Sequence, residues 1–130
     1  MSEKKFTIVE LPLKVPHFTT TEEVIEMCKS TTYEDGTMYS FPVQMYNNDH
    51  NINWFDLNKV FNILDQWCGF VIGFRIKEKK PLVIIKVADV PNGKMLLSLY
   101  DAEYPIYVCP VGIAENNKLL KVQTFRVVSN

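Results

Sequence analysis

A broad apolar stripe makes the stretch from Ile52 to Gly69, INWFDLNKVFNILDQWCG, the most strongly patterned segment of the chain. Its large apolar side chains recur every three or four residues with polar residues between them, which is the period of an amphipathic helix. Asn53 is a natural N-cap, Asp56 occupies the capping-box position, and Gly69 is a typical residue at a helix C-terminus. We therefore predict one long helix that ends at Gly69 and lies across a sheet.

A second, shorter helix is predicted from Thr21 to Lys29. Thr20 is its expected N-cap, and a glutamate at the third helical position completes a capping box. Glutamates in the first turns favour the positive end of the helix dipole. A run of only about ten residues needs tertiary packing to persist as a helix. The acidic residues of this predicted helix are Glu22, Glu23 and Glu26.

Strand patterns dominate the rest of the chain. Two short candidates, Lys5–Leu11 and Val43–Tyr46, lie before the long helix, with an Asp35-Gly36 hairpin signal between them. Five more follow it: Phe70–Lys77, Leu82–Ala88, Lys94–Tyr100, Ile106–Gly112 and Leu119–Val128. Their short connectors leave no room for helices, so we expect an antiparallel meander.

These elements predict an α+β fold in a single domain over residues 1–130. The sheet would be an antiparallel β-meander of about five to seven strands, either open or partly closed. The long helix and the short helix would pack on a face of it. Strict alternation along Phe70–Lys77 places Phe70, Ile72, Phe74 and Ile76 on one face. The same alternation places Arg75 and Lys77 on the other.

Composition narrows the class of protein. The chain is 47% hydrophobic and 12% aromatic, which is ample for a folded core, and its net charge is −1. Residues 1–66 carry a net charge of −5 and residues 67–130 one of +4. No apolar run has the length of a membrane-spanning helix, and the N-terminus lacks the apolar core of a signal peptide. We expect no membrane association and a cytoplasmic location, or the host-cell cytoplasm if the protein is viral.

Neither metal nor cofactor chemistry is predicted. Cys28, Cys68 and Cys109 are an odd, widely spaced set without a C-x-x-C pair, so we expect reduced and mostly buried thiols. The glycines are not spaced to form a phosphate-binding loop. Asp49 and His50, with His17, are the weak candidates for general acid–base catalysis in a small hydrolase-type enzyme. A solvated turn explains Asp49 and His50 equally well.

Binding to another macromolecule is the function that these patterns favour. The Asn-, Lys- and Ile-rich usage is similar to that of small bacterial or viral accessory proteins, and a protein partner or a second copy of the chain is our first expectation. The predicted contact residues are acidic or aromatic: Glu22, Glu23, Glu26, Tyr33, Tyr39 and Phe41. The alternative is single-stranded nucleic acid, bound by a basic sheet face containing Arg75, Lys77 and Lys86.

Overall fold

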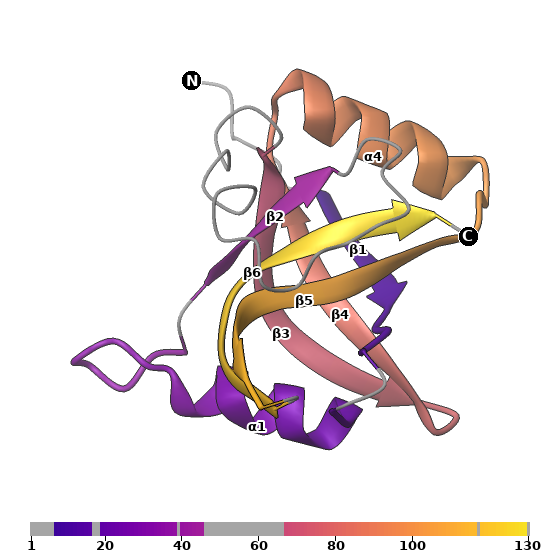
Figure 1. Cartoon of the computed structure of the whole chain (residues 1–130). Coiled ribbons are helices and arrows are strands. Elements are labelled where there is room, and N and C mark those ends of the chain that lie inside the picture. The colour runs from indigo at the N-terminus through magenta and orange to yellow at the C-terminus, as the bar shows by residue number, and fades with distance from the viewer. Residues whose placement is uncertain (1–6, 17–18, 39, 46–66, 117, 130) are drawn as a thin grey trace.

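A six-stranded sheet and two helices make up the part of the chain that the computed structural model describes, residues 7–16, 19–38, 40–45, 67–116 and 118–129 (Figure 1). The strands are β1 (Thr7–Pro12), β2 (Phe41–Met45), β3 (Trp67–Lys77), β4 (Lys80–Val87), β5 (Ile106–Glu115) and β6 (Lys118–Ser129). The helices are α1 (Thr21–Ser30) and α4 (Pro91–Asp101). The α+β class is therefore confirmed, although the sheet differs from the predicted meander.

The sheet is mixed rather than purely antiparallel. Its strand order is β1-β4-β3-β2-β6-β5, and β2 runs parallel to β6 while the other neighbours are antiparallel. Side chains support the parallel pair: the Thr124 hydroxyl donates to the Pro42 carbonyl at 2.7 Å. The buried Arg126 donates from Nε to Oε1 of the buried Gln44 at 3.3 Å. Because these partners lie far apart in the sequence, local patterns did not predict their pairing.

The two outer strands of the sheet meet at one end. Leu13, just after β1, forms a parallel bridge with Val108 of β5, and the Lys14 N–H donates to the Val108 carbonyl at 2.9 Å. The Lys14 ammonium also lies 5.1 Å from the centre of the Tyr107 ring, at a distance that favours a cation–π contact. The sheet is thus curled into a half-barrel, which is the partly closed alternative that the sequence patterns had left open.

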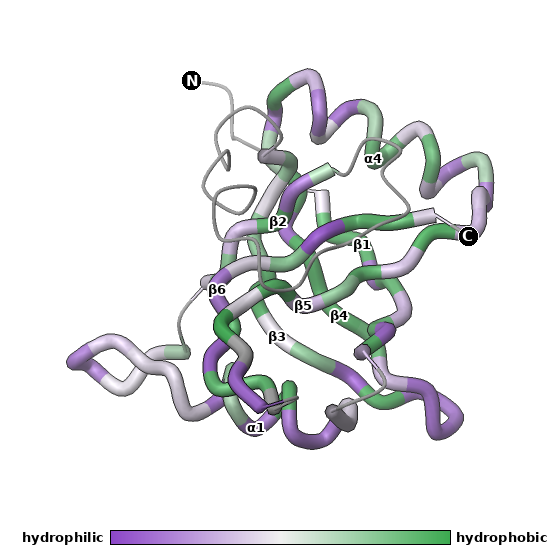
Figure 2. Tube along the Cα trace, viewed as in Figure 1, coloured by the Kyte–Doolittle hydropathy of each residue, from purple (hydrophilic) through white to green (hydrophobic). Residues whose placement is uncertain are grey.

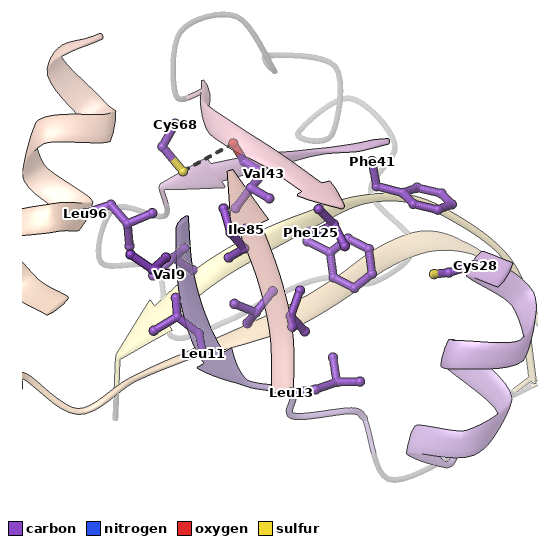
Figure 3. Packing of buried hydrophobic residues seen from close by; sticks show 14 of the residues in the cluster. Val9, Leu11, Leu13, Cys28, Phe41, Val43, Cys68, Ile85, Leu96 and Phe125 are labelled. Atoms are coloured by element: carbon purple, nitrogen blue, oxygen red, sulfur yellow. Dashed lines mark hydrogen bonds between the residues drawn. The ribbon is translucent and has the colours of Figure 1, made fainter. Parts of the chain in front are cut away.

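The hydrophobic core fills the inside of the curl, and the two helices cover its opposite ends (Figures 1 and 3). Leu96 of α4 is fully buried near the end of the sheet that contains Cys68. Cys28 of α1 is fully buried at the other end, on the side of Phe41 and Phe125. The tube in Figure 2 is mostly hydrophobic along the strands and hydrophilic at the β3–β4 turn. α1 and α4 therefore lie at opposite ends of the core. The helix predicted to share a face with the short helix was the long helix, most of which lies outside the described residues.

α4 corrects one of the predicted strands. The segment Lys94–Tyr100, expected as part of the meander, is helical, and Pro91 stands in the first helical turn, where proline is favoured. Gly93 packs so closely on the end of β4 that a Cβ would overlap the Ala88 carbonyl oxygen. The helix carries the chain from β4 to β5, which lies at the far edge of the sheet. A crossover thus replaces the predicted hairpin.

The predicted long helix does not end at Gly69. Trp67, Cys68 and Gly69 belong to β3, and residues 52–66 of the predicted helix lie outside the described residues. The pairing of β3 with β4 requires a glycine here, because a Cβ at position 69 would lie 2.4 Å from the Lys86 carbonyl oxygen of β4. Gly69 therefore permits close pairing of two strands instead of terminating a helix.

α1 and the turn that follows it match the sequence patterns. The Thr20 hydroxyl accepts a hydrogen bond from the Glu23 N–H at 3.2 Å, as expected of an N-cap. In the predicted hairpin, Thr32 pairs with Met38 and Gly36 has a positive φ of 88°. Hydrogen bonds from Thr37 hold the pKa of the Asp35 carboxyl below its usual value.

Candidate functional site

A bulge in β3 determines which side chains share the outer face of the sheet. The register between β3 and β4 shifts between Val71 and Gly73, so Ile72 is an extra residue in the strand. Beyond the shift, Arg75 pairs with Leu82; before it, Phe70 pairs with Lys86. The predicted alternation, which put Phe70 on the face opposite Arg75 and Lys77, is therefore wrong.

The outer face of β1, β4 and β3 is the side opposite the buried Val83, Ile85 and Val87. Cross-strand pairing arranges its residues in four rows: Ile8–Lys86–Phe70, Glu10–Ile84–Gly73, Pro12–Leu82–Arg75 and Lys80–Lys77. We call this surface the basic face and include Ile72 in the bulge. Three of its large apolar side chains are open to solvent, with exposed fractions of 55% for Ile8, 36% for Phe70 and 41% for Ile72, while Leu82 and Ile84 are half-buried.

Positive charge is concentrated at one end of the basic face. Lys77 and Lys80 lie directly opposite each other, an arrangement that like charges make unfavourable. The two-residue turn between them consists of Glu78 and Lys79, both with left-handed backbone angles, φ 51° and 66°. An anion bound here would relieve the repulsion between the lysines.

An ion pair crosses the basic face. Arg75 Nη1 of β3 lies 3.2 Å from Glu10 Oε1 of β1, so the contact spans the intervening strand β4. The side chains are 55% and 30% exposed, respectively. Glu10 is the acidic side chain within the four rows, and it fixes one nitrogen of the guanidinium.

Phe70 belongs to an aromatic pair at the other end of the basic face. Its ring centre lies 5.2 Å from that of Trp67 with an interplanar angle of 66°, an edge-to-face arrangement. Lys86 is the cross-strand neighbour of Phe70, with Ile8 on its far side. The basic face thus combines an exposed ring, aliphatic side chains and basic groups within three adjacent strands.

The residues predicted to contact a protein partner are not equally available. Glu22, Glu23 and Glu26 are exposed on α1, but Thr21 and Thr19 hydroxyls donate to the first two carboxylates, each at 3.2 Å. These bonds and the helix dipole give Glu22 and Glu23 a local role at the helix N-terminus.

The aromatic members of that predicted surface are divided between the core and the surface. Tyr33 is 50% exposed in the turn after α1. Phe41 is only 2% exposed and packs edge-to-face on Phe125, with ring centres 5.8 Å apart, so its assignment as a surface contact is wrong. Tyr39 lies outside the described residues. The predicted contact surface therefore loses its most apolar member.

The predicted catalytic residues Asp49, His50 and His17 all lie outside the described part of the chain. Within the described ranges, no group of three His, Cys, Asp or Glu side chains is placed to hold a metal ion. Neither α1 nor α4 has the length and apolar character needed to cross a membrane. Burial raises the pKa of Cys28 and Cys68 to about 12 and that of Cys109 to about 11, so none of these thiols is an activated nucleophile.

Sequence reasoning found the basic residues of the basic face but missed its apolar ones. Phe70 and Ile72 had been assigned to the opposite face because regular alternation was assumed. The isolated Gly73 inside a strand pattern was a usable signal, since such a glycine often marks a bulge.

Comparison with protein-family models, curated proteins and solved structures finds no match to this chain.

Proposed function

We propose that this protein binds single-stranded nucleic acid across the basic face. The observation that carries the proposal is the position of Phe70 beside Lys86 on the same face as Arg75 and Lys77. An exposed ring can stack on an unpaired base, while neighbouring cations contact the phosphates. The bulge at Ile72 supports this assignment because it places the ring and the cations on one surface.

Single-stranded rather than duplex nucleic acid follows from the apolar content of the surface. A ligand recognised by its phosphates alone needs only the basic residues. The exposed Ile8, Phe70 and Ile72 gain contact area only from bases that are not already stacked in a duplex. The whole-chain net charge of −1 is compatible with this function because charge is segregated, with +4 on residues 67–130.

The proposal is tested by fluorescence anisotropy with a labelled, unstructured oligonucleotide of about 12 nucleotides, a length suited to one small domain. Phe70→Ala should weaken binding about tenfold with an unchanged salt dependence, because stacking is lost and phosphate contacts remain. Lys77→Ala should reduce the slope of log affinity against log salt by about one. Circular dichroism and thermal unfolding verify that each variant is folded.

Matched controls come from β6, a strand that does not belong to the basic face. Leu120 on β6 is an exposed apolar residue, and Lys121 beside it is an exposed lysine. Leu120→Ala and Lys121→Ala should leave both the affinity and the salt slope unchanged. Absence of oligonucleotide binding at about 50 mM salt would refute the proposal, as would equal losses in Phe70→Ala and Leu120→Ala.

Binding of a protein partner at α1 is the second candidate function. It is favoured by Tyr33, which is half-exposed in a turn that projects beside α1 (Figure 1). Glu26, on the following turn of the helix, extends the acidic surface. Replacing Glu22, Glu23 and Glu26 with lysine should abolish capture of such a partner from nuclease-treated extract. Undiminished capture by the folded triple variant would exclude α1 as the contact.

A further inference from the structure

We propose that Glu10 limits the affinity of the basic face by competing with a ligand phosphate for Arg75. This inference rests on the proposed function and assigns a role to a residue that the sequence patterns did not single out. Its structural basis is the 3.2 Å ion pair between Arg75 Nη1 and Glu10 Oε1 across β4.

The geometry of the pair leaves the arginine able to exchange partners. The recorded contact uses one guanidinium nitrogen and one carboxylate oxygen, whereas a guanidinium can form two parallel bonds to a carboxylate or a phosphate. The Arg75 side chain is 55% exposed, so water screens the pair and a phosphate can approach it. A bidentate phosphate contact can therefore replace the single contact with Glu10.

The position of Glu10 makes its charge unfavourable for any bound polyanion. It lies in the second of the four rows, beside Ile84, with the row that contains Lys86 and Phe70 on one side. The row that contains Arg75 is on its other side. If Arg75 stays with Glu10, the ligand loses a phosphate contact; if Arg75 moves to the ligand, an uncompensated carboxylate remains beside the phosphates. Either arrangement lowers affinity, so binding remains weak and readily reversible.

The test is the uncharged variant Glu10→Gln, which keeps the side-chain size and one acceptor oxygen. It should bind the labelled oligonucleotide about threefold to tenfold more tightly than the wild type, with a salt slope steeper by about one. The same change in an Arg75→Ala background should give a clearly smaller gain, because only the repulsion between the carboxylate and the phosphates is then removed and the contested arginine is absent. Glu34→Gln, at an exposed glutamate in the turn after α1, is the control and should leave the affinity unchanged.

The outcomes separate this inference from the proposed function. Wild-type binding that Glu10→Gln does not strengthen refutes the role of Glu10 alone. A gain of equal size in the Arg75→Ala background also refutes it, because the effect would then be one of overall charge. Binding by Glu10→Gln where the wild type shows none supports the inference, and binding by neither protein refutes both proposals.

Discussion

Burial determines the chemistry of the three cysteines at the residue scale. Cys28 and Cys68 are fully buried and Cys109 is 6% exposed, in agreement with the expectation of free, buried thiols. The Cys68 thiol also donates to the Val43 carbonyl at 3.4 Å, so it occupies a defined position in the core. The free energy of unfolding should therefore depend on pH in the alkaline range.

The direction of that pH dependence follows from the raised thiol pKa values. The pKa is 9.0 for an unperturbed thiol, against about 12 for Cys28 and Cys68 and about 11 for Cys109 in the folded protein. Between these values the unfolded chain releases protons that the folded chain retains, so stability is complete below pH 9 and falls as pH rises towards 11 to 12. Each thiol should cost about 1.4 kcal/mol at a pH one unit above 9.

Urea unfolding at pH 8 and pH 10 measures this loss. Lysines and tyrosines also titrate in this range, so the informative quantity is the difference between the wild type and Cys28→Ala. The variant should lose about 1.4 kcal/mol less than the wild type between the two pH values. An identical loss in both proteins would show that the Cys28 thiol ionises as easily when folded as when unfolded.

At the element scale, patterns succeeded where a segment has one periodicity and local stop signals. β4, β5, β6 and α1 lie within a few residues of their predicted bounds, and Thr20 caps α1 as expected. The prediction for the segment Lys94–Tyr100 was wrong because its apolar run fits either a strand or a short helix. The short connector before this segment was expected to leave no room for a helix, whereas Pro91, Asn92 and Gly93 form the first turn of α4. The burial of Leu96 in the core, which favours the helix, is a tertiary feature and is not visible in the local pattern.

In the candidate site, the local pattern likewise predicted some features of one strand correctly and others wrongly. Alternation predicted that Arg75 and Lys77 share a face, because both lie on the same side of the bulge. It could not place Phe70, since a single inserted residue exchanges the two faces for the part of the strand that precedes it. Glu10 was missed for a different reason: it meets Arg75 only because β1 pairs with β4, a long-range choice of neighbour.

For the whole molecule, sheet order is the feature that the sequence left undetermined. Short connectors suggested neighbours in chain order, but β2 enters between β3 and β6, and α4 carries the chain across to the far edge. The Thr124–Pro42 bond joins residues 82 positions apart. Such pairings depend on which faces bury the most apolar surface together, and on the closure of the outer strands at Leu13 and Val108.

The placement of α1 and α4 at opposite ends of the half-barrel predicts how their contributions to stability combine. Val24 of α1 and Leu96 of α4 are both fully buried. Val24→Ala should cost about 2 kcal/mol and Leu96→Ala about 2–4 kcal/mol in the free energy of unfolding, and the double variant should show their sum within about 0.5 kcal/mol.

Additivity is expected because the helices cover different ends of the core and residues without shared partners respond independently (Figure 1). Phe41→Leu and Phe125→Leu provide the contrast, since their rings are in edge-to-face contact and should show a coupling of about 0.5–1.5 kcal/mol. Urea unfolding of both double-mutant cycles gives the two coupling energies. A coupling above about 1 kcal/mol between Val24 and Leu96 would mean that the core transmits strain from one helix to the other, contrary to this arrangement.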